Sequence, residues 1–249
     1  MYLVNDYIAN PTHNIDIALV GVGGTGSFVL PELALLSKTL EQLGRKPLNV
    51  HVFDHDKVET HNVGRQKFFD ADVGLYKAEV LTQRVNRAMG TNFHFYNKKF
   101  DSYAKGTFNI VITCVDKLAI RKKINKHLKT QIGRPTYHGT YYWIDAGNSR
   151  DYGQVILGSY IRNPKSTARS PHIIPDLPNI IALHPDIKED KNEPSCSMRA
   201  SLNQQSFMIN KLTGVYVMEM LSSLLLDFNI LQSQVYFSLN PINVKTNKL

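Results

Sequence analysis

A glycine-rich turn near the N-terminus constrains the fold of this chain most. The apolar run IDIALV (15–20) leads directly into GVGGTG, and a segment with helical spacing (25–44) follows. The glycines of the turn are Gly21, Gly23, Gly24 and Gly26. A buried strand, a GxGxxG turn and a helix, in this order, are typical of a nucleotide-binding βαβ unit. The first glycine permits the tight turn, and the next two let the backbone approach a phosphate at the helix N-terminus.

Strand and helix patterns alternate along the following hundred residues. Strand patterns lie at 48–53, 92–97, 109–115, 141–148 and 152–160, and helix patterns lie at 75–90 and 116–133. This alternation predicts an α/β fold, a Rossmann-like doubly wound and mostly parallel sheet. We take residues 15–150 as its nucleotide-binding core.

The composition changes after the last of these strands. Residues 161–197 contain six of the eleven prolines and show little periodicity, which predicts a long crossover loop. An apolar helical pattern then runs to about residue 228, and VYFSL (235–239) reads as a final strand. We therefore expect a single domain over 1–249 whose last part, 198–249, is a C-terminal helix and strand.

Composition limits the class of protein. The chain has 249 residues, is 43% hydrophobic and carries a net charge of +8, which suits an acidic partner such as a nucleotide. Two cysteines are too few for a disulfide scaffold. The first residues lack the form of a signal peptide, and the longest nearly apolar stretch (215–226) is too short to span a bilayer. We expect a cytoplasmic protein without a membrane partner.

Polar residues gather where the predicted strands end. Asp54 ends the second strand, where a carboxylate can accept hydrogen bonds from ribose hydroxyls. Asn62 and Arg65 follow in DHDKVETHNVGRQ, and Lys77 opens the next helix. Arginine offers a bidentate fork for phosphate oxygens and lysine a mobile charge, so together they suit a triphosphate. Asp116 ends the strand at 109–115, where a lone carboxylate beside phosphates is a natural Mg²⁺ ligand.

Together, GVGGTG, DHDKVETHNVGRQ, Lys77 and TCVD resemble the ThiF/MoeB/ubiquitin-activating-enzyme (HesA/MoeB/ThiF) family. The resemblance implies that the chain binds ATP and Mg²⁺ and adenylates the C-terminal carboxylate of a small ubiquitin-like (β-grasp) protein. It assigns Asp54 to the ribose and Asn62, Arg65 and Lys77 to the phosphates, with Asp116 holding Mg²⁺. It also implies a homodimer.

Cys196 lies between the proline-rich loop and the predicted C-terminal helix. A thiol at a helix N-terminus has a lowered pKa, and Arg199 adds to this effect. The family resemblance makes Cys196 the candidate that takes the acyl group as a thioester or joins in sulfur transfer; the alternative is an incidental, half-buried thiol. Cys114 lies in an apolar strand and reads as core. The segment 194–210 most resembles the ThiF-type protein of the PRTRC cassette of bacterial plasmids and mobile elements.

The chain departs from the family in three places. It has no CxxC pair, so no zinc is expected; it has no arginine before Gly21; and Lys117 stands where the family has asparagine. The histidines near the site read as polar lining rather than metal ligands. The basic face of helix 117–129 reads as solvated rather than as a nucleic-acid surface. It is formed by Lys117, Arg121, Lys122, Lys123, Lys126 and Lys129.

Two other functions remain open from the sequence. The glycine turn and Asp54 alone also suit an NAD- or FAD-dependent oxidoreductase. The missing arginine, the missing zinc pairs and the basic helix suit a non-catalytic, nucleotide-binding scaffold of a plasmid cassette.

Overall fold

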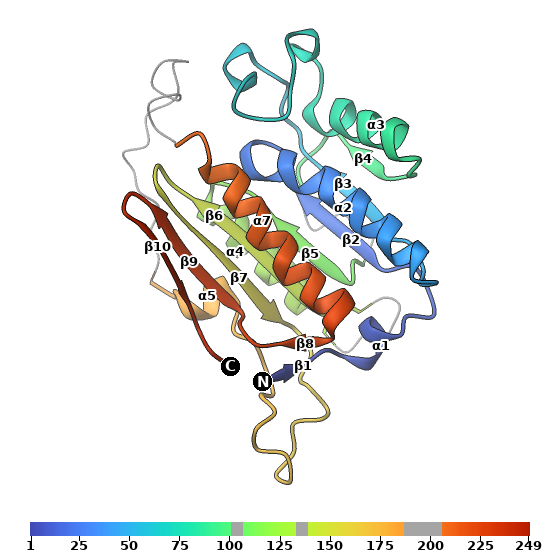
Figure 1. The fold of residues 1–249 in the computed structure, drawn as a ribbon, viewed down its shortest axis with the longest axis vertical. Helices are drawn as coiled ribbons and strands as arrows, with labels where there is room; N and C mark the ends of the chain where they lie inside the picture. Colours follow the sequence, from blue (N-terminus) through green and yellow to red (C-terminus); the bar gives the residue numbers. More distant parts are fainter. Residues whose placement is uncertain (101–106, 133–138, 187–205) are drawn as a thin grey trace.

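The computed structural model describes residues 1–100, 107–132, 139–186 and 206–249. Its centre is an eight-stranded sheet in the order β10-β9-β7-β6-β5-β2-β3-β4 (Figure 1). The strands of this sheet are β2 (Asp16–Val20), β3 (Asn49–Phe53), β4 (His94–Tyr96), β5 (Ile110–Thr113), β6 (Tyr142–Asn148), β7 (Tyr152–Ser159), β9 (Gln234–Leu239) and β10 (Ile242–Thr246).

Helices cover both faces of the sheet. They are α1 (Asp6–Ala9), α2 (Gly24–Gln42), α3 (Lys77–Met89), α4 (Leu118–Lys129), α5 (Ile180–Leu183) and α7 (Ile209–Ser222). Short 3₁₀ turns lie at Thr60–Asn62 and Asp70–Asp72, and a π-helical turn lies at Ser223–Asp227. A separate antiparallel pair joins β1 (Tyr2–Leu3) to β8 (Asn229–Ile230).

The predicted Rossmann-like, mostly parallel sheet is confirmed. Strands β4, β3, β2, β5 and β6 are parallel neighbours. Beyond β6 the sheet continues with antiparallel strands β7, β9 and β10. The strand β10 was not predicted; all five of its residues are exposed, and only Ile242 and Val244 among them are apolar. The sheet therefore consists of a parallel part, typical of nucleotide-binding folds, and an antiparallel extension.

Alternating side chains of the parallel strands explain the two helical layers. On β2, Ile17 and Leu19 belong to the core that contains residues of α2, α3 and α7. Ala18 and Val20 belong to a second core, with α4 and α5 on the other face. Because successive side chains of a strand point to opposite faces, a run that is apolar throughout requires cover on both. Figure 1 shows α2 and α7 side by side on the near face, with α4 and α5 behind.

The C-terminal helix differs from its prediction. Helix α7 begins at Ile209, whereas the apolar pattern predicted a helix from residue 198; residues 198–205 lie outside the described part of the chain. The N–H of Ser206 donates to the carbonyl of Arg150 (2.8 Å), so the described residues just before α7 are tied to the β6–β7 turn.

The described part of the proline-rich crossover, 161–186, is irregular apart from the single-turn helix α5. No helix among the described residues combines the length and apolarity that crossing a bilayer requires.

Candidate functional site

Three parallel strands end level with one another. Val20 at the end of β2 pairs with Phe53 of β3 on one side and Thr113 of β5 on the other. The next residues continue the ladder: the N–H of Gly21 donates to Phe53, and that of Cys114 to Val20, both at 2.8 Å. The glycine turn, Asp54 and the segment leading to Asp116 therefore start from one edge, where ligands of such sheets bind.

Close packing against neighbouring atoms explains three of the four glycines in the turn. Gly21 has φ +87°, and a Cβ there would lie 2.7 Å from the carbonyl oxygen of Cys114. A Cβ on Gly26 would overlap the carbonyl oxygen of Gly21, and one on Gly24 would lie 2.5 Å from Oδ1 of Asn210. No side chain fits at any of these positions without movement of its neighbours.

Gly23 has a different environment. It is the N-cap of α2, and a Cβ there would meet only the carboxamide of Gln66, 3.9 Å away. Oε1 of Gln66 is buried and has no hydrogen-bond partner. The start of α2 thus presents unhindered backbone beside an unsatisfied amide oxygen, and the helix N-terminus favours an anion there.

Asp54 is attached to the glycine turn. Its Oδ2 accepts from the N–H of Val22 (2.8 Å) and its Oδ1 from the N–H of Asp56 (2.9 Å). Burial raises the pKa of the Asp54 carboxyl, while these two hydrogen bonds oppose the rise. A carboxylate has about four acceptor positions, so capacity remains for the ribose hydroxyls that Asp54 is predicted to bind.

Lys77 lies in the same cluster. It is the first residue of α3 and only 8% exposed, and its Nζ is 3.7 Å from Oδ2 of Asp56. Its backbone N–H donates to the carbonyl of Asp56 (3.0 Å), and its positive charge weakly opposes the rise in the pKa of Asp54 that burial causes. The structure thus brings together two of the predicted residues, Asp54 and Lys77, because both contact Asp56.

The loop that carries Asn62 and Arg65 folds back over the start of α2. Asn62 is buried; its Oδ1 accepts from the N–H of Glu59 (2.9 Å), and its carbonyl accepts from the N–H groups of Arg65 and Gln66. Asn62 therefore shapes the loop, and only its amide Nδ2 is left for the predicted phosphate contact. Arg65 is partly exposed and precedes Gln66, the residue that faces Gly23.

Asp116 lies just beyond β5 and is exposed. Its backbone carbonyl accepts from Nη1 of Arg121 (3.2 Å), and the role of its carboxylate as a Mg²⁺ ligand stays a prediction. Cys114, two residues earlier, packs against the core, and burial raises the pKa of its thiol. Cys196 lies outside the described residues, so its role stays a prediction.

A second arrangement of possible metal ligands was missed. Among the described residues, Asp54, His55 and Asp56 each offer a ligand atom within 4.8 Å of the others. Both oxygens of Asp54 already accept backbone hydrogen bonds, so a cation here would share them with the N–H groups of Val22 and Asp56.

Comparison with known proteins agrees with this architecture. The model of the ThiF family matches residues 10–248. The chain belongs to the ThiF family. The NEDD8-activating enzyme E1 catalytic subunit of Arabidopsis thaliana is 35% identical over 118 residues, 45% of this chain and 24% of that protein. Ubiquitin-like modifier-activating enzyme 5 of Caenorhabditis briggsae is 27% identical over 215 residues, 79% of this chain and 44% of that protein.

A solved structure supports the fold. The crystal structure of E. coli MccB with ATP superimposes with a TM-score of 0.58 at 15% identity, over 94% of this chain and 64% of MccB. This ThiF-family chain spans a quarter to under half of the length of the curated relatives it matches. The similarity to MccB at this level of identity concerns the fold alone.

Beside the site, this ThiF-family chain has a buried polar network that the sequence did not reveal. Asp145 on β6 is 1% exposed, and Nε of Arg121 donates to both its oxygens, at 2.9 and 3.0 Å. The hydroxyl of Thr113 donates to Asp145 (2.5 Å) and accepts from the indole of Trp143 (2.9 Å). Burial raises the pKa of Asp145, and Arg121 opposes this. The prediction that Arg121 lies on a solvated face is therefore wrong. An acidic residue inside the apolar strand 141–148 was the sequence feature that indicated a buried basic partner.

A second network joins the start of α2 to β6 and α7. Nδ2 of Asn148 lies within hydrogen-bond distance of Thr25, Asn210 and Thr213, at 3.1, 2.9 and 3.2 Å. Because Asn210 also fills the space above Gly24, this network sets the position of α2 relative to the sheet. Nothing in the sequence pattern links Thr25 to a residue 185 positions away, so the network could not be predicted.

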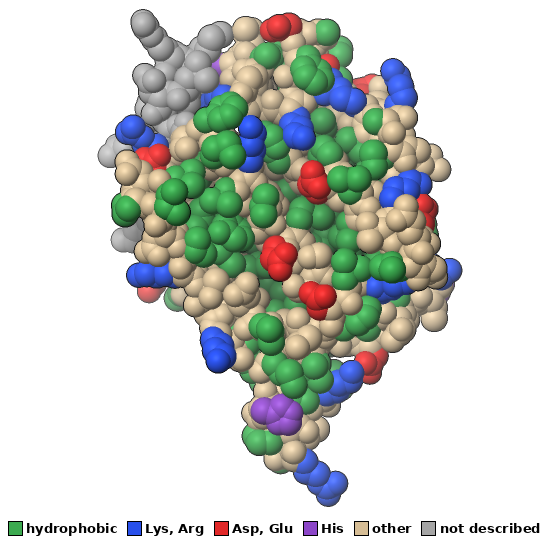
Figure 2. Space-filling model, viewed as in Figure 1, with side chains coloured by type: hydrophobic (Ala, Val, Ile, Leu, Met, Phe, Trp, Pro, Cys, Tyr) green, Lys and Arg blue, Asp and Glu red, His purple; other side chains and the backbone are tan. Residues whose placement is uncertain are grey.

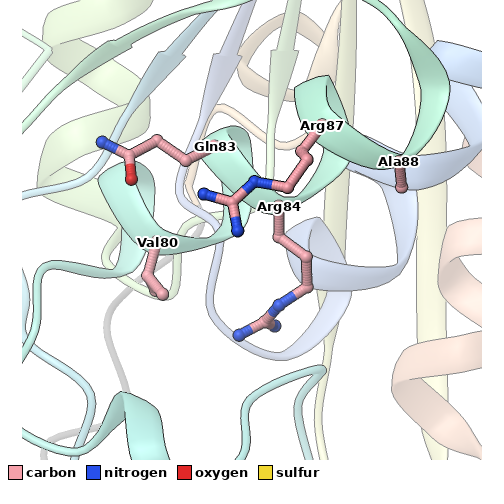
Figure 3. Close-up of a pocket in the computed structure, with 5 residues that line it drawn as sticks. All are labelled: Val80, Gln83, Arg84, Arg87 and Ala88. Atoms are coloured by element: carbon pink, nitrogen blue, oxygen red, sulfur yellow. The ribbon is translucent and has the colours of Figure 1, made fainter.

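Two hollows lie in the described surface, and none of the glycines of the turn lines either of them. One, of about 350 Å³, lies along α3, and Figure 3 shows the side chains around it. Its Arg84 binds both oxygens of Asp72 at 2.6 Å and the carbonyl of Lys67 at 3.0 Å, which indicates a structural role. The other lies between α2 and α7. Neither is lined by the residues predicted to bind the nucleotide.

Proposed function

We propose that this chain catalyses ATP-dependent adenylation of the C-terminal carboxylate of a small ubiquitin-like protein. The observation that carries the proposal is the hydrogen bond of Asp54 to the glycine turn, with Lys77 paired to the neighbouring Asp56, in a chain of the ThiF family. The named relatives are a NEDD8-activating enzyme and a ubiquitin-like modifier-activating enzyme, and MccB has been crystallised with ATP. These names support the reaction class over the oxidoreductase alternative.

The arrangement suits binding of a triphosphate. The open backbone at Gly23 and the start of α2 offer N–H groups to phosphate oxygens, and Lys77 and Arg65 add positive charge. In this proposal Asp54 accepts hydrogen bonds from the ribose hydroxyls, a role supported by its attachment to the glycine turn. The orphaned Oε1 of Gln66, beside Gly23, is an acceptor, so it suits a hydroxyl or amino donor of the nucleotide rather than its phosphates. Mg²⁺, held by Asp116, would contribute charge neutralisation at the phosphates.

The reaction needs no side-chain base. The attacking group is already a carboxylate: one of its oxygens forms a bond to the α-phosphorus, and the bond to the leaving pyrophosphate breaks. The products are an acyl adenylate and pyrophosphate. The residues of this chain lower the barrier by holding the reactants in line and by offsetting negative charge.

Pyrophosphate exchange tests this proposal. We expect a ubiquitin-like protein with a free C-terminus to drive exchange of labelled pyrophosphate into ATP, and the same protein with an amidated C-terminus to drive none. Asp116→Ala should reduce exchange by roughly 100-fold or more, as loss of a transition-state charge contact does; its neighbour Lys117→Ala should change it little. ATP binding without exchange by any ubiquitin-like protein would instead favour the scaffold alternative.

Cys196 extends the proposal. Its thiolate would attack the acyl carbon, form a thioester and release AMP, as in a two-step activating enzyme. We expect a thiol-sensitive adduct that Cys196→Ala abolishes while pyrophosphate exchange survives. An adduct unchanged in this variant would remove Cys196 from the mechanism. The PRTRC-type cassette partner and the homodimer belong to the same proposal.

A further inference from the structure

Arg121 and Asp145 form an ion pair in the interior of the chain. Figure 2 shows lysine, arginine, aspartate and glutamate side chains at the surface of one face of the molecule, where charges are usually found. By contrast, the side chains of Arg121 and Asp145 are only 11% and 1% exposed. A hydrophobic pair of similar volume is often as stable as a buried ion pair, so stability alone explains this pair poorly.

The guanidinium of Arg121 contacts three residues at once. Its Nε donates to both oxygens of Asp145 (2.9 and 3.0 Å), its Nη2 to the carbonyl of Ala146 (3.1 Å) and its Nη1 to the carbonyl of Asp116 (3.2 Å). Gly147 leaves room for the guanidinium, since a Cβ there would lie 3.1 Å from Nη2. Two of the three contacts are with β6, so this strand fixes the guanidinium that binds Asp116.

Asp116 lies where the chain has already left the sheet. The pairing of β5 with β6 ends at Thr113, and the last hydrogen bond to β2 comes from the N–H of Cys114. The bond from Arg121 is the one hydrogen bond that Asp116 forms within the part of the chain that the structure describes. Helix α4 then begins without a side-chain cap. The arginine is therefore the polar group that connects the Asp116 backbone to the sheet.

The carboxylate of Asp116 fits a magnesium ion in its chemistry and its place. Asp116 is exposed, it follows β5 at the edge where β2 and β3 also end, and carboxylate oxygens are ligands that Mg²⁺ prefers. Mg²⁺ also demands nearly ideal octahedral geometry at short distances. A carboxylate on a backbone that nothing holds would meet this demand poorly.

We propose that Arg121, fixed by Asp145, is a positioning residue that holds the Asp116 backbone so that its carboxylate can meet the Mg²⁺ of bound ATP. The inference rests on the proposed function, in which Asp116 is the metal ligand. Arg121 itself contacts neither metal nor nucleotide. A lysine could pair with Asp145, but its single ammonium lacks the planar fork that spans all three contacts.

ATP binding with and without metal tests this role. Isothermal titration calorimetry gives the Kd of ATP in EDTA and in excess Mg²⁺. In Arg121→Lys the Kd in EDTA should equal that of the native chain, because the glycine turn and Lys77 are unchanged. The Kd with Mg²⁺ should be roughly 10-fold weaker or more, as loss of a group that orients a metal ligand produces. Arg121→Met/Asp145→Leu, which removes both buried charges, should show the same loss.

The matched control is Thr113→Val. The hydroxyl of Thr113 donates to Asp145 (2.5 Å), so this variant disturbs the same buried network but keeps the bond from Arg121 to Asp116. It should unfold more easily, yet Mg²⁺ should tighten its ATP binding as much as in the native chain. In an Asp116→Ala background, Arg121→Lys should cause no further loss, because both changes act through one ligand.

The outcomes separate this inference from the proposed function. Equal tightening by Mg²⁺ in the native chain and both Arg121 variants would overturn the inference alone, as would a Thr113→Val variant that loses the tightening to the same extent. Additive losses in the Asp116→Ala background, or a native Kd that Mg²⁺ does not change, would also overturn it. A native chain that binds no ATP under either condition would overturn the proposed function and the inference with it.

Discussion

The four glycines of the turn are present for different physical reasons. Gly21, Gly24 and Gly26 are required by neighbouring atoms, whereas Gly23 has room beside it. A phosphate-binding turn needs this combination, because the chain must turn tightly and still leave backbone N–H groups accessible to the ligand. The GxGxxG pattern in the sequence does not by itself distinguish these roles.

We predict that Gly26→Ala destabilises the protein by about 3 kcal/mol, because the added Cβ overlaps the backbone carbonyl of Gly21 and neither can move freely. The control is Gly44→Ala, at φ +73° with open space around it, for which the backbone conformation alone costs about 1 kcal/mol. Urea denaturation of both variants measures the difference. Equal losses would show that the turn relaxes around the methyl group.

At the scale of elements, α4 has two faces with different roles. Its lysines are exposed, but Arg121 turns inward to the carboxylate of Asp145 on β6, and its Nη2 donates to the carbonyl of Ala146 (3.1 Å). One arginine thus connects this helix to the strand that completes the parallel half of the sheet, beside the segment that carries Asp116.

We predict that Arg121→Met lowers the free energy of unfolding by about 3 kcal/mol, because it leaves the charge of Asp145 buried without its partner. Lys123→Met, on the exposed side of the same helix, should change stability by less than about 0.5 kcal/mol. Chemical denaturation compares the two. In Arg121→Met/Asp145→Leu most of the stability should return; a double variant no more stable than the single would contradict the buried-charge explanation.

For the whole molecule, strand order determines where the candidate site lies. The reversal of strand order on either side of β2 brings the ends of β2, β3 and β5 together, and helices on both faces hold those strands in place. The antiparallel strands β7, β9 and β10 extend the sheet away from this edge.

We predict that ATP with Mg²⁺, at about 100 times its Kd, stabilises the folded chain by about 2.7 kcal/mol, because it binds the folded state alone. For a chain of this length the midpoint of thermal unfolding should rise by about 5–10 °C. NAD and FAD at the same concentration should produce no comparable shift. A shift with NAD and none with ATP would favour the oxidoreductase alternative.

Local sequence patterns were enough to predict much of the fold and several residues of the candidate site. The strand–glycine–helix pattern at 15–44, the apolar strands and the glycine that ends α3 all depend on near neighbours, so the sequence alone was enough for the Rossmann-like core. Asp54 and Lys77 could be proposed together because both sit at element boundaries that parallel topology brings to one edge.

Contacts between distant segments could not be predicted in this way. The sequence by itself determined the α/β class, the glycine turn and the acidic and basic residues around it, because periodicity and spacing are local properties. Only the tertiary structure decided that Arg121 turns inward to Asp145, that Asn148 joins Asn210 and Thr25, and that α7 starts at Ile209. The reason is physical: a buried charge or amide must find its partner wherever the packed chain supplies one, at any distance along the sequence.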